Sequence, residues 1–250
     1  MKIISTFILL HLSFHLLAQT DSTKMVQPES VEKVWQFNGN IQLNNNGISP
    51  VPAFSLGKPS LMSALFVKKG GFIYSPEFNY GADGKPWVVN NWFRYQWIRG
   101  NFTYRTGLNF SLFFGRDKVL KDNKIIEVVK LNQYTALEAG LSYKLSDKNS
   151  LSLTYWNSYG LDYGSVKSGH FLMLSASFSK IPLSKSLFLQ LRPNVFYLNN
   201  KVPYEGLFVS AITSIVHKKY PFSLFIQGVK PIWVAQKTKS NWNYGLNYTF

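Results

Sequence analysis

The chain contains no cysteine and few acidic residues. Among 250 residues there are 27 Lys or Arg against 12 Asp or Glu, which gives a formal net charge of +15. The absence of cysteine excludes disulfides, thiolate zinc sites, a cysteine nucleophile and the acylated cysteine of a lipoprotein anchor. The four histidines and the scattered acids show no metal-ligand spacing, so we expect neither a metal nor another cofactor.

Long apolar runs are also missing, apart from one at the N-terminus. Residues 3–17 are mostly apolar, Lys2 precedes them and the small residue Ala18 follows them. This run is shorter than the roughly 18 residues of a membrane-spanning helix and is interrupted by polar residues. Residues 1–18 therefore predict a cleaved secretory signal peptide, and the polar residues 19–34 a periplasmic lead-in.

Aromatic residues are abundant, with 20 Phe, 14 Tyr and 7 Trp, although the mean hydropathy is only −0.07. From Trp35 onward, apolar and polar residues alternate, most clearly over 242–250 (WNYGLNYTF). Successive side chains of a strand point to opposite faces, so each such segment has one apolar and one polar face. Twelve segments follow this pattern, although Leu207–Val216 shows no clear alternation; their ranges are about 35–45, 60–68, 71–80, 86–98, 101–114, 127–145, 149–160, 168–180, 185–198, 204–217, 220–229 and 239–250.

Short and long connections alternate between these segments. The even number of segments puts the short turns and both chain ends on one side, and the longer connections, such as 115–126, on the other. This arrangement is typical of a transmembrane barrel. We predict an all-β fold: one closed antiparallel transmembrane β-barrel over 35–250 with about 12 strands, and with 10 or 14 as alternatives. A soluble β-sandwich is the competing fold.

A barrel also explains the composition. Backbone groups in hydrocarbon must be paired, so the sheet closes on itself, with an apolar outer face and a polar lumen. The near-zero hydropathy is then an average over the two faces. Aromatic side chains such as Tyr95, Trp97, Trp242 and Tyr244 are expected at the membrane interfaces.

The signal peptide, the alternation and the last segment NWNYGLNYTF together resemble bacterial outer-membrane β-barrel proteins. The segment GKPWVVNNWFRYQW (84–97) is similar to a stretch in uncharacterised members of this class, and it implies no activity. In that family the barrel-assembly machinery reads a last strand with a C-terminal Phe. The resemblance implies that Tyr248 and Phe250 form this insertion signal and that the location is the outer membrane of a Gram-negative envelope.

The polar positions of the strands predict a cluster of charges in the lumen. Glu77, Arg94, Arg105 and Glu138 fall on neighbouring strands at similar depth, and Arg192 lies further along with Gln190 and Asn194. One hypothesis is a polar, basic constriction that admits small polar or anionic solutes. The other is a set of ion pairs that fills the lumen and fixes the barrel's shape. The residues leave both open.

The excess positive charge is expected at the turns, as with Lys218 and Lys219, and in larger part in the outer loops. Lysines that fall there could bind outer-membrane lipids and lipopolysaccharide or attract an anionic solute; these are Lys118, Lys121, Lys124, Lys167, Lys201, Lys230, Lys237 and Lys239. Solvated loop charge is the alternative. We expect no nucleic-acid partner, since the aromatics follow strand alternation and the chain is exported.

Three functions follow in order of preference. The first is a porin-like channel or transport protein for polar or anionic solutes, and the second is a non-conducting structural or interaction barrel. The third is a lipid hydrolase at the rim, for which His170 and Ser168 share one face of a strand. No Asn or Asp that would orient His170 is evident, so we expect that the protein is not an enzyme.

Overall fold

The structure is a computed structural model that describes residues 34–48, 55–121, 123–163, 165–200, 205–235 and 239–250. The predicted signal peptide lies outside the described residues, as does the predicted lead-in except for its last residue. Both therefore stay predictions. Within the described part, no helix is long and apolar enough to cross a membrane.

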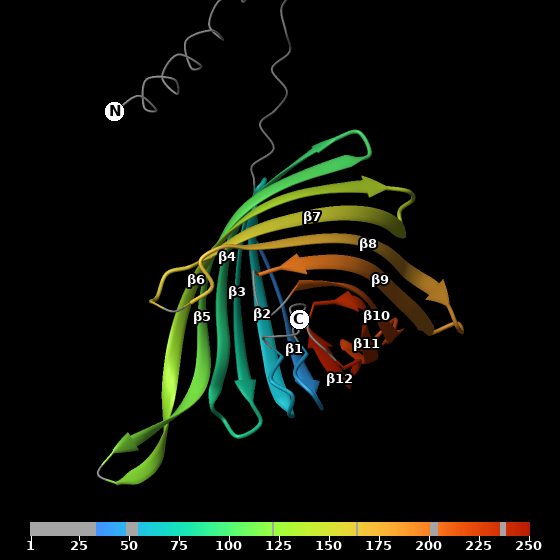
Figure 1. Cartoon of the computed structure of the whole chain (residues 1–250). Helices are drawn as coiled ribbons and strands as arrows, with labels where there is room; N and C mark the ends of the chain where they lie inside the picture. Colours follow the sequence, from blue (N-terminus) through green and yellow to red (C-terminus); the bar gives the residue numbers. More distant parts are fainter. Residues whose placement is uncertain (1–33, 49–54, 122, 164, 201–204, 236–238) are drawn as a thin grey trace, which may run out of the picture. The chain divides into compact units, whose positions relative to one another are not determined.

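Twelve antiparallel strands form one closed barrel, which confirms the predicted fold and strand number (Figure 1). Each strand pairs with its neighbours in the sequence, and β1 pairs with β12 to close the sheet. The strands are β1 (Gln36–Asn44), β2 (Ser60–Lys69), β3 (Phe72–Gly81), β4 (Pro86–Arg99), β5 (Phe102–Lys121), β6 (Lys124–Lys144), β7 (Asn149–Gly160), β8 (Gly169–Pro182), β9 (Leu187–Asn199), β10 (Glu205–His217), β11 (Phe222–Val234) and β12 (Asn241–Thr249).

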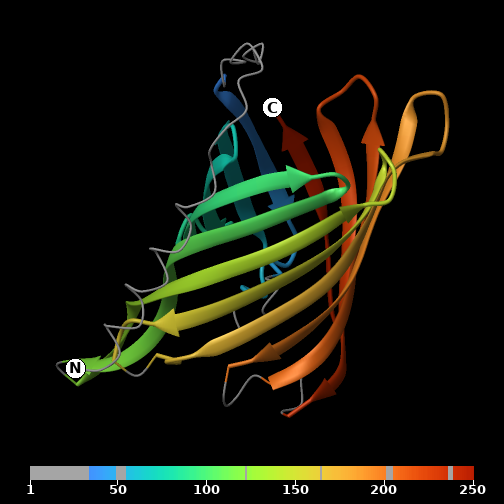
Figure 2. The ribbon, with the colours of Figure 1, turned by 90° about the horizontal axis from the view of Figure 1, so that it is seen from above.

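The outer face of the barrel is apolar and the inner face is largely polar. Leu108, Leu137 and Leu174 are 48, 56 and 54% exposed, whereas Asn109 and Glu138 beside them are 3% exposed. This burial pattern is inverted relative to a water-soluble protein, in which the leucines would fill the core. The strands run obliquely around the barrel (Figure 2), as closure of a sheet requires.

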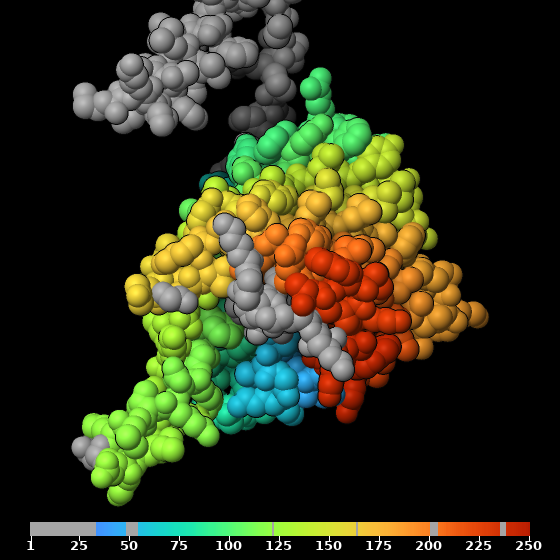
Figure 3. Space-filling view, viewed as in Figure 1, coloured from blue at the N-terminus to red at the C-terminus, as the bar shows by residue number. Residues whose placement is uncertain are grey.

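The connection predicted over 115–126 is wrong, because 115–121 continue β5 and 124–126 already belong to β6. β5 and β6 pair without interruption up to Lys121 and Lys124, and this hairpin extends past the neighbouring strands (Figure 1, Figure 3). Val119 faces Ile126 and Leu120 faces Ile125, so apolar side chains pair across the hairpin. Its many charged residues are not typical of a strand, but some of them pair across the hairpin, as Arg116 does with Glu127 at 2.6 Å.

Two further details differ from the expected pattern. The connection between β3 and β4 is a turn of only 82–85, the same length as the longest turns on the opposite side. The segment without clear alternation forms β10, with Phe208 and Ile212 on its inner face. Its pattern is obscured because apolar and polar side chains both occur on this part of the inner face, as with Phe208 and Ser210.

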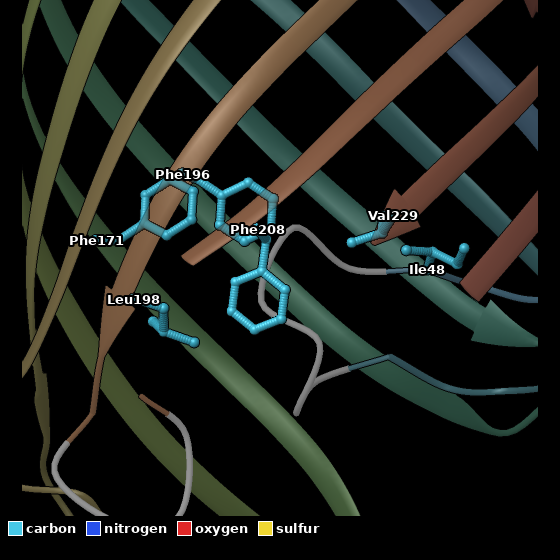
Figure 4. Packing of buried hydrophobic residues seen from close by; sticks show 6 residues of the cluster. All are labelled: Ile48, Phe171, Phe196, Leu198, Phe208 and Val229. Atoms are coloured by element: carbon cyan, nitrogen blue, oxygen red, sulfur yellow. The ribbon is translucent and has the colours of Figure 1, made fainter. Parts of the chain in front are cut away.

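The main apolar cluster lies inside the barrel. Phe171, Phe196 and Phe208 pack against one another there (Figure 4). Ile48, from the connection between β1 and β2, joins the same cluster beside Val229. The barrel therefore contains a small packed core on one part of its inner wall.

Candidate functional site: the charged wall of the lumen

Glu138 is the centre of the charged cluster. Its side chain has no exposed surface, and its Oε1 lies 2.9 Å from Arg94 Nε and 2.6 Å from Arg105 Nε. Arg94 Nη2 also donates to Oε2 at 3.2 Å, and Trp156 Nε1 donates to the same oxygen at 2.7 Å. One buried carboxylate thus contacts two cations, and the three side chains together carry a net positive charge.

Two glycines make this geometry possible. Gly107 stands between Arg94 and Glu138 in the strand register, and Gly140 stands opposite Arg105. A Cβ atom on Gly107 would lie 3.0 Å from Arg94 Cγ, and one on Gly140 would lie 3.4 Å from Arg105 Nε. Arg94 therefore reaches from β4 across β5 over Gly107, and Arg105 reaches the adjacent β6 over Gly140. Glycines at polar positions next to arginines were a signal that sequence reasoning did not use.

The two arginines differ in their contacts and in their exposure to solvent. Arg94 Nη1 donates to Ser75 Oγ at 2.8 Å, and its guanidinium lies 4.0 Å from the centre of the Trp92 ring. With Glu138 these contacts fix Arg94 on three sides. The side chain of Arg105 is 36% exposed against 14% for Arg94. Arg105 is thus the cation of the pair that a solute in the lumen can reach.

Glu77 and Arg192 do not join this ion pair. Glu77 on β3 accepts a hydrogen bond from Asn90 Nδ2 at 2.8 Å, and the described residues place no cation within ion-pair distance of its carboxylate. Arg192 on β9 is exposed and lies opposite Ile212 on β10, away from Glu138. The sequence pattern placed all five residues on the inner face, but the structure brings only three of them together.

A cavity of about 350 Å³ lies beside the charged wall. It is lined by Glu77 and Arg94 from that wall, and by amide, hydroxyl and aromatic groups of β4 to β9. Ser111 Oγ donates to Asn90 Oδ1 at 2.6 Å, which extends the polar contacts of Glu77 along the wall. The cavity is at the small end of the usual range for ligand pockets, roughly 300–1,000 Å³.

Aromatic rings form the facing part of the lumen, which sequence reasoning missed. Centroid distances of 5.3, 4.7, 5.4 and 5.0 Å join Trp92, Trp156, Phe171, Phe196 and Phe208 in that order. The last three distances match the spacing of neighbouring strands, so β7, β8, β9 and β10 each contribute one ring to the row, whereas Trp92 comes from β4, which is not a neighbour of β7. The available signal was the presence of aromatics at the polar positions of β4 and β7 to β10.

The predicted insertion signal lies where the barrel closes. Phe250 exchanges two backbone hydrogen bonds with Gly39, at 2.9 and 3.0 Å, and its ring stacks on Tyr248 at 5.9 Å. Further along this seam, the buried Asn243 donates to Asn44 Oδ1 at 3.0 Å. Tyr248 and Phe250 thus have a structural role in closure, and recognition by assembly machinery stays a prediction.

The candidate hydrolase pair is not assembled as expected. His170 Nδ1 lies 2.7 Å from Tyr155 Oη and 3.3 Å from Asn157 Nδ2, so an asparagine does adjoin the histidine, contrary to the sequence analysis. Within the described part of the chain, the structure gives Ser168 no hydrogen bond to His170. No group of acids and histidines that could hold a metal occurs among the described residues.

Comparison with known proteins supports the fold. No protein-family model matches the chain, and no curated protein is similar in sequence. Solved structures do match: a NanC porin has a TM-score of 0.54 at 10% identity and covers 85% of this chain and 98% of that chain. A KdgM porin solved with oligogalacturonate (TM-score 0.50, 11% identity) covers 87% of this chain and 99% of its own.

An outer-membrane channel from Pseudomonas putida F1 gives the same result, with a TM-score of 0.50 at 10% identity over 92% of this chain and 99% of that chain. At such low identity the likeness establishes the fold alone. The chain has the closed, porin-like β-barrel fold of outer-membrane proteins.

Proposed function

We propose that this protein is an outer-membrane channel that admits small polar solutes and prefers anions. The observation that carries the proposal is Arg192, an exposed cation on the inner wall without an ion-pair partner among the described residues. Arg105 adds a second cation that solutes can reach. With Glu77, Arg94 and Glu138 included, these inner side chains carry a net charge of +1.

The rest of the wall suits a polar solute. Amide and hydroxyl groups such as Asn194 and Ser210, joined at 2.7 Å, line the lumen near Arg192. Such groups can replace part of a solute's hydration. A KdgM porin of the same fold was solved with oligogalacturonate, an anionic oligosaccharide, which supports the preference for anions.

Planar-bilayer recording on the refolded protein tests the proposal. We expect ion conductance in the wild type and, in a salt gradient, a reversal potential that indicates anion preference. Arg192→Gln and Arg105→Gln should each reduce that preference, because each removes a reachable lumen cation. Arg99→Gln is the matched control, since it removes one charge from an exposed residue at the end of β4 outside the lumen.

Absence of conductance in the wild type would overturn the channel and favour the second candidate, a non-conducting structural barrel. One observation favours that candidate: the ring cluster with Ile48 fills part of the lumen. An equal loss of anion preference in Arg99→Gln would contradict the role given to Arg192.

A further inference from the structure

Basic side chains gather at the end of the barrel where the short turns lie. We define the turn-side rim as residues 68–71, 99–101, 144–149, 180–186 and 217–221, the five short connections with the strand ends that flank them. Nine basic residues belong to it: Lys68, Lys69, Arg99, Lys144, Lys148, Lys180, Lys185, Lys218 and Lys219. All of them except Lys68 are exposed.

Acidic side chains hardly balance this charge. Within the turn-side rim the single acidic side chain is Asp147, and it is bound to Lys144 at 2.6 Å. At the opposite end, ten basic and five acidic side chains occur among the described residues. The sequence analysis assigned more of the excess charge to the outer loops than to the turns, whereas the larger unbalanced charge lies at the turn-side rim.

An aromatic belt on the outer face of the barrel adjoins this rim. Trp97 stacks on Tyr104 at 5.4 Å, and Phe102 packs against Tyr143 at 4.9 Å. Lys69 Nζ lies 5.2 Å from the centre of the Trp35 ring, so a rim cation contacts an outward-facing aromatic ring directly. Aromatic belts sit at the boundary between hydrocarbon and headgroups, which puts the adjoining cations at headgroup level.

The distribution of the cations indicates the kind of partner. Each of the five segments of the turn-side rim, strand ends included, contains at least one Lys or Arg, so the charge surrounds the barrel instead of forming a patch on one side. A docked protein would need one continuous patch, whereas a bilayer leaflet contacts the whole circumference. Lysines and arginines at a membrane surface attract anionic phospholipids, by about 1 kcal/mol per residue.

We propose that the turn-side rim binds the anionic phospholipid headgroups of the leaflet that it faces. This inference rests on the membrane location proposed above. It adds an interaction that the channel function does not require, because the rim cations are separate from Arg105 and Arg192, on which the anion preference rests.

Spin-label spectroscopy of the refolded full chain tests this interaction. The protein is inserted into phosphatidylcholine vesicles that contain spin-labelled phosphatidylglycerol or spin-labelled phosphatidylcholine. We expect the immobilised fraction at the barrel surface to favour phosphatidylglycerol by at least about twofold, and this preference to vanish at about 1 M salt, where the screening length is about 3 Å.

Two matched variants locate the effect. The turn variant carries Lys148→Gln, Lys185→Gln, Lys218→Gln and Lys219→Gln, all at exposed residues of the turn-side rim. The control variant carries Lys118→Gln, Lys121→Gln, Lys124→Gln and Lys130→Gln in the long hairpin. We expect the turn variant to lose more than half of the preference and the control to keep it.

The outcomes separate this inference from the proposed function. An inserted barrel without preference for phosphatidylglycerol, or an equal loss in both variants, overturns the headgroup interaction and leaves the channel intact. A folded barrel that does not insert into vesicles overturns the membrane location and, with it, this inference.

Discussion

The two walls of the lumen are stabilised in different ways. On β3 to β6, one buried carboxylate holds two arginines, and glycines leave room for their side chains. On β7 to β10, rings from successive strands stack into an apolar cluster. A barrel interior need not be uniformly polar, because each wall requires only that its own groups are satisfied.

Trp156 connects the two walls. Its ring stacks on Phe171 at 4.7 Å, and its indole nitrogen donates to Glu138 at 2.7 Å. The charged wall depends on pairing, so the loss of one partner leaves a charge uncompensated. The ring wall depends on contact area, so a truncation leaves a void. Substitutions on either side should distinguish these two dependencies.

The largest effect is expected at Glu138. Glu138→Ala leaves Arg94 and Arg105 without their shared acid and should lower the free energy of unfolding by about 3–5 kcal/mol. Urea unfolding of the refolded protein in detergent micelles, followed by tryptophan fluorescence, measures it. Glu127→Ala, in the exposed hairpin, is the control and should cost less than about 1 kcal/mol. Equal effects in the two variants would contradict the pairing of the charged wall.

A truncation in the ring wall, the stacked aromatic rings of β7 to β10, should lower the free energy of unfolding by about 3 kcal/mol. Phe196 is 2% exposed and lies between two other rings, so Phe196→Ala leaves a void that the rigid strands cannot close. The same unfolding measurement applies, with the outward-facing Phe72→Ala as control. A loss no greater than that of the control would show that this cluster is not a packed core.

Trp156, which connects the two walls, should contribute less to the free energy of unfolding. Trp156→Phe keeps an aromatic ring and removes the donor to Glu138, so we expect a loss of about 2 kcal/mol. In a double-mutant cycle, this change should couple to Glu138→Ala and add independently to Phe196→Ala. Coupling to Phe196 alone would mean that Trp156 acts only through packing. Trp97→Phe, on the outer face, is the control.

The smallest effect on stability is expected at Asp83, an exposed acid whose charge is screened by water. A hydrogen bond from Lys58 at 2.8 Å lowers the pKa of Asp83, in the turn after β3. A lowered pKa contributes stability above the ordinary aspartate pKa of about 3.9, and this contribution is lost as the pH falls through the lowered value. Melting temperatures from about pH 6 to pH 2 should therefore fall slightly more for the wild type than for Asp83→Asn. Identical pH profiles would contradict this.

The sequence predicted the fold well because alternation is a local property. Alternation assigns residues such as Leu108 and Asn109 to the outer or inner face without any information on the neighbouring strands. The barrel, its twelve strands and the inward side of Glu138 could therefore be predicted from the sequence. The contacts of Glu138 did not follow. They depend on register, which sets Arg94 and Glu138 on either side of Gly107, and register cannot be deduced from alternation alone.

The ring wall was missed for a related reason. Phe196 and Phe208 occupy positions that the pattern assigns to a polar lumen, and their neighbours across the strands become visible only in the structure. The long hairpin was missed because charged residues mask a strand when cross-strand pairs, such as Arg116 with Glu127 at 2.6 Å, compensate them.

The seam between β1 and β12 has a consequence for how the barrel forms. Its five register pairs join residues that are about two hundred positions apart in the chain, from Asn40 with Thr249 to Asn44 with Gly245. Contacts of such separation are the slowest to form, since the whole chain must be ordered before they can. Until Phe250 reaches Gly39, the sheet has two open edges that can pair with other chains. The pairing of β12 with β1 thus ends the interval in which the open sheet can aggregate.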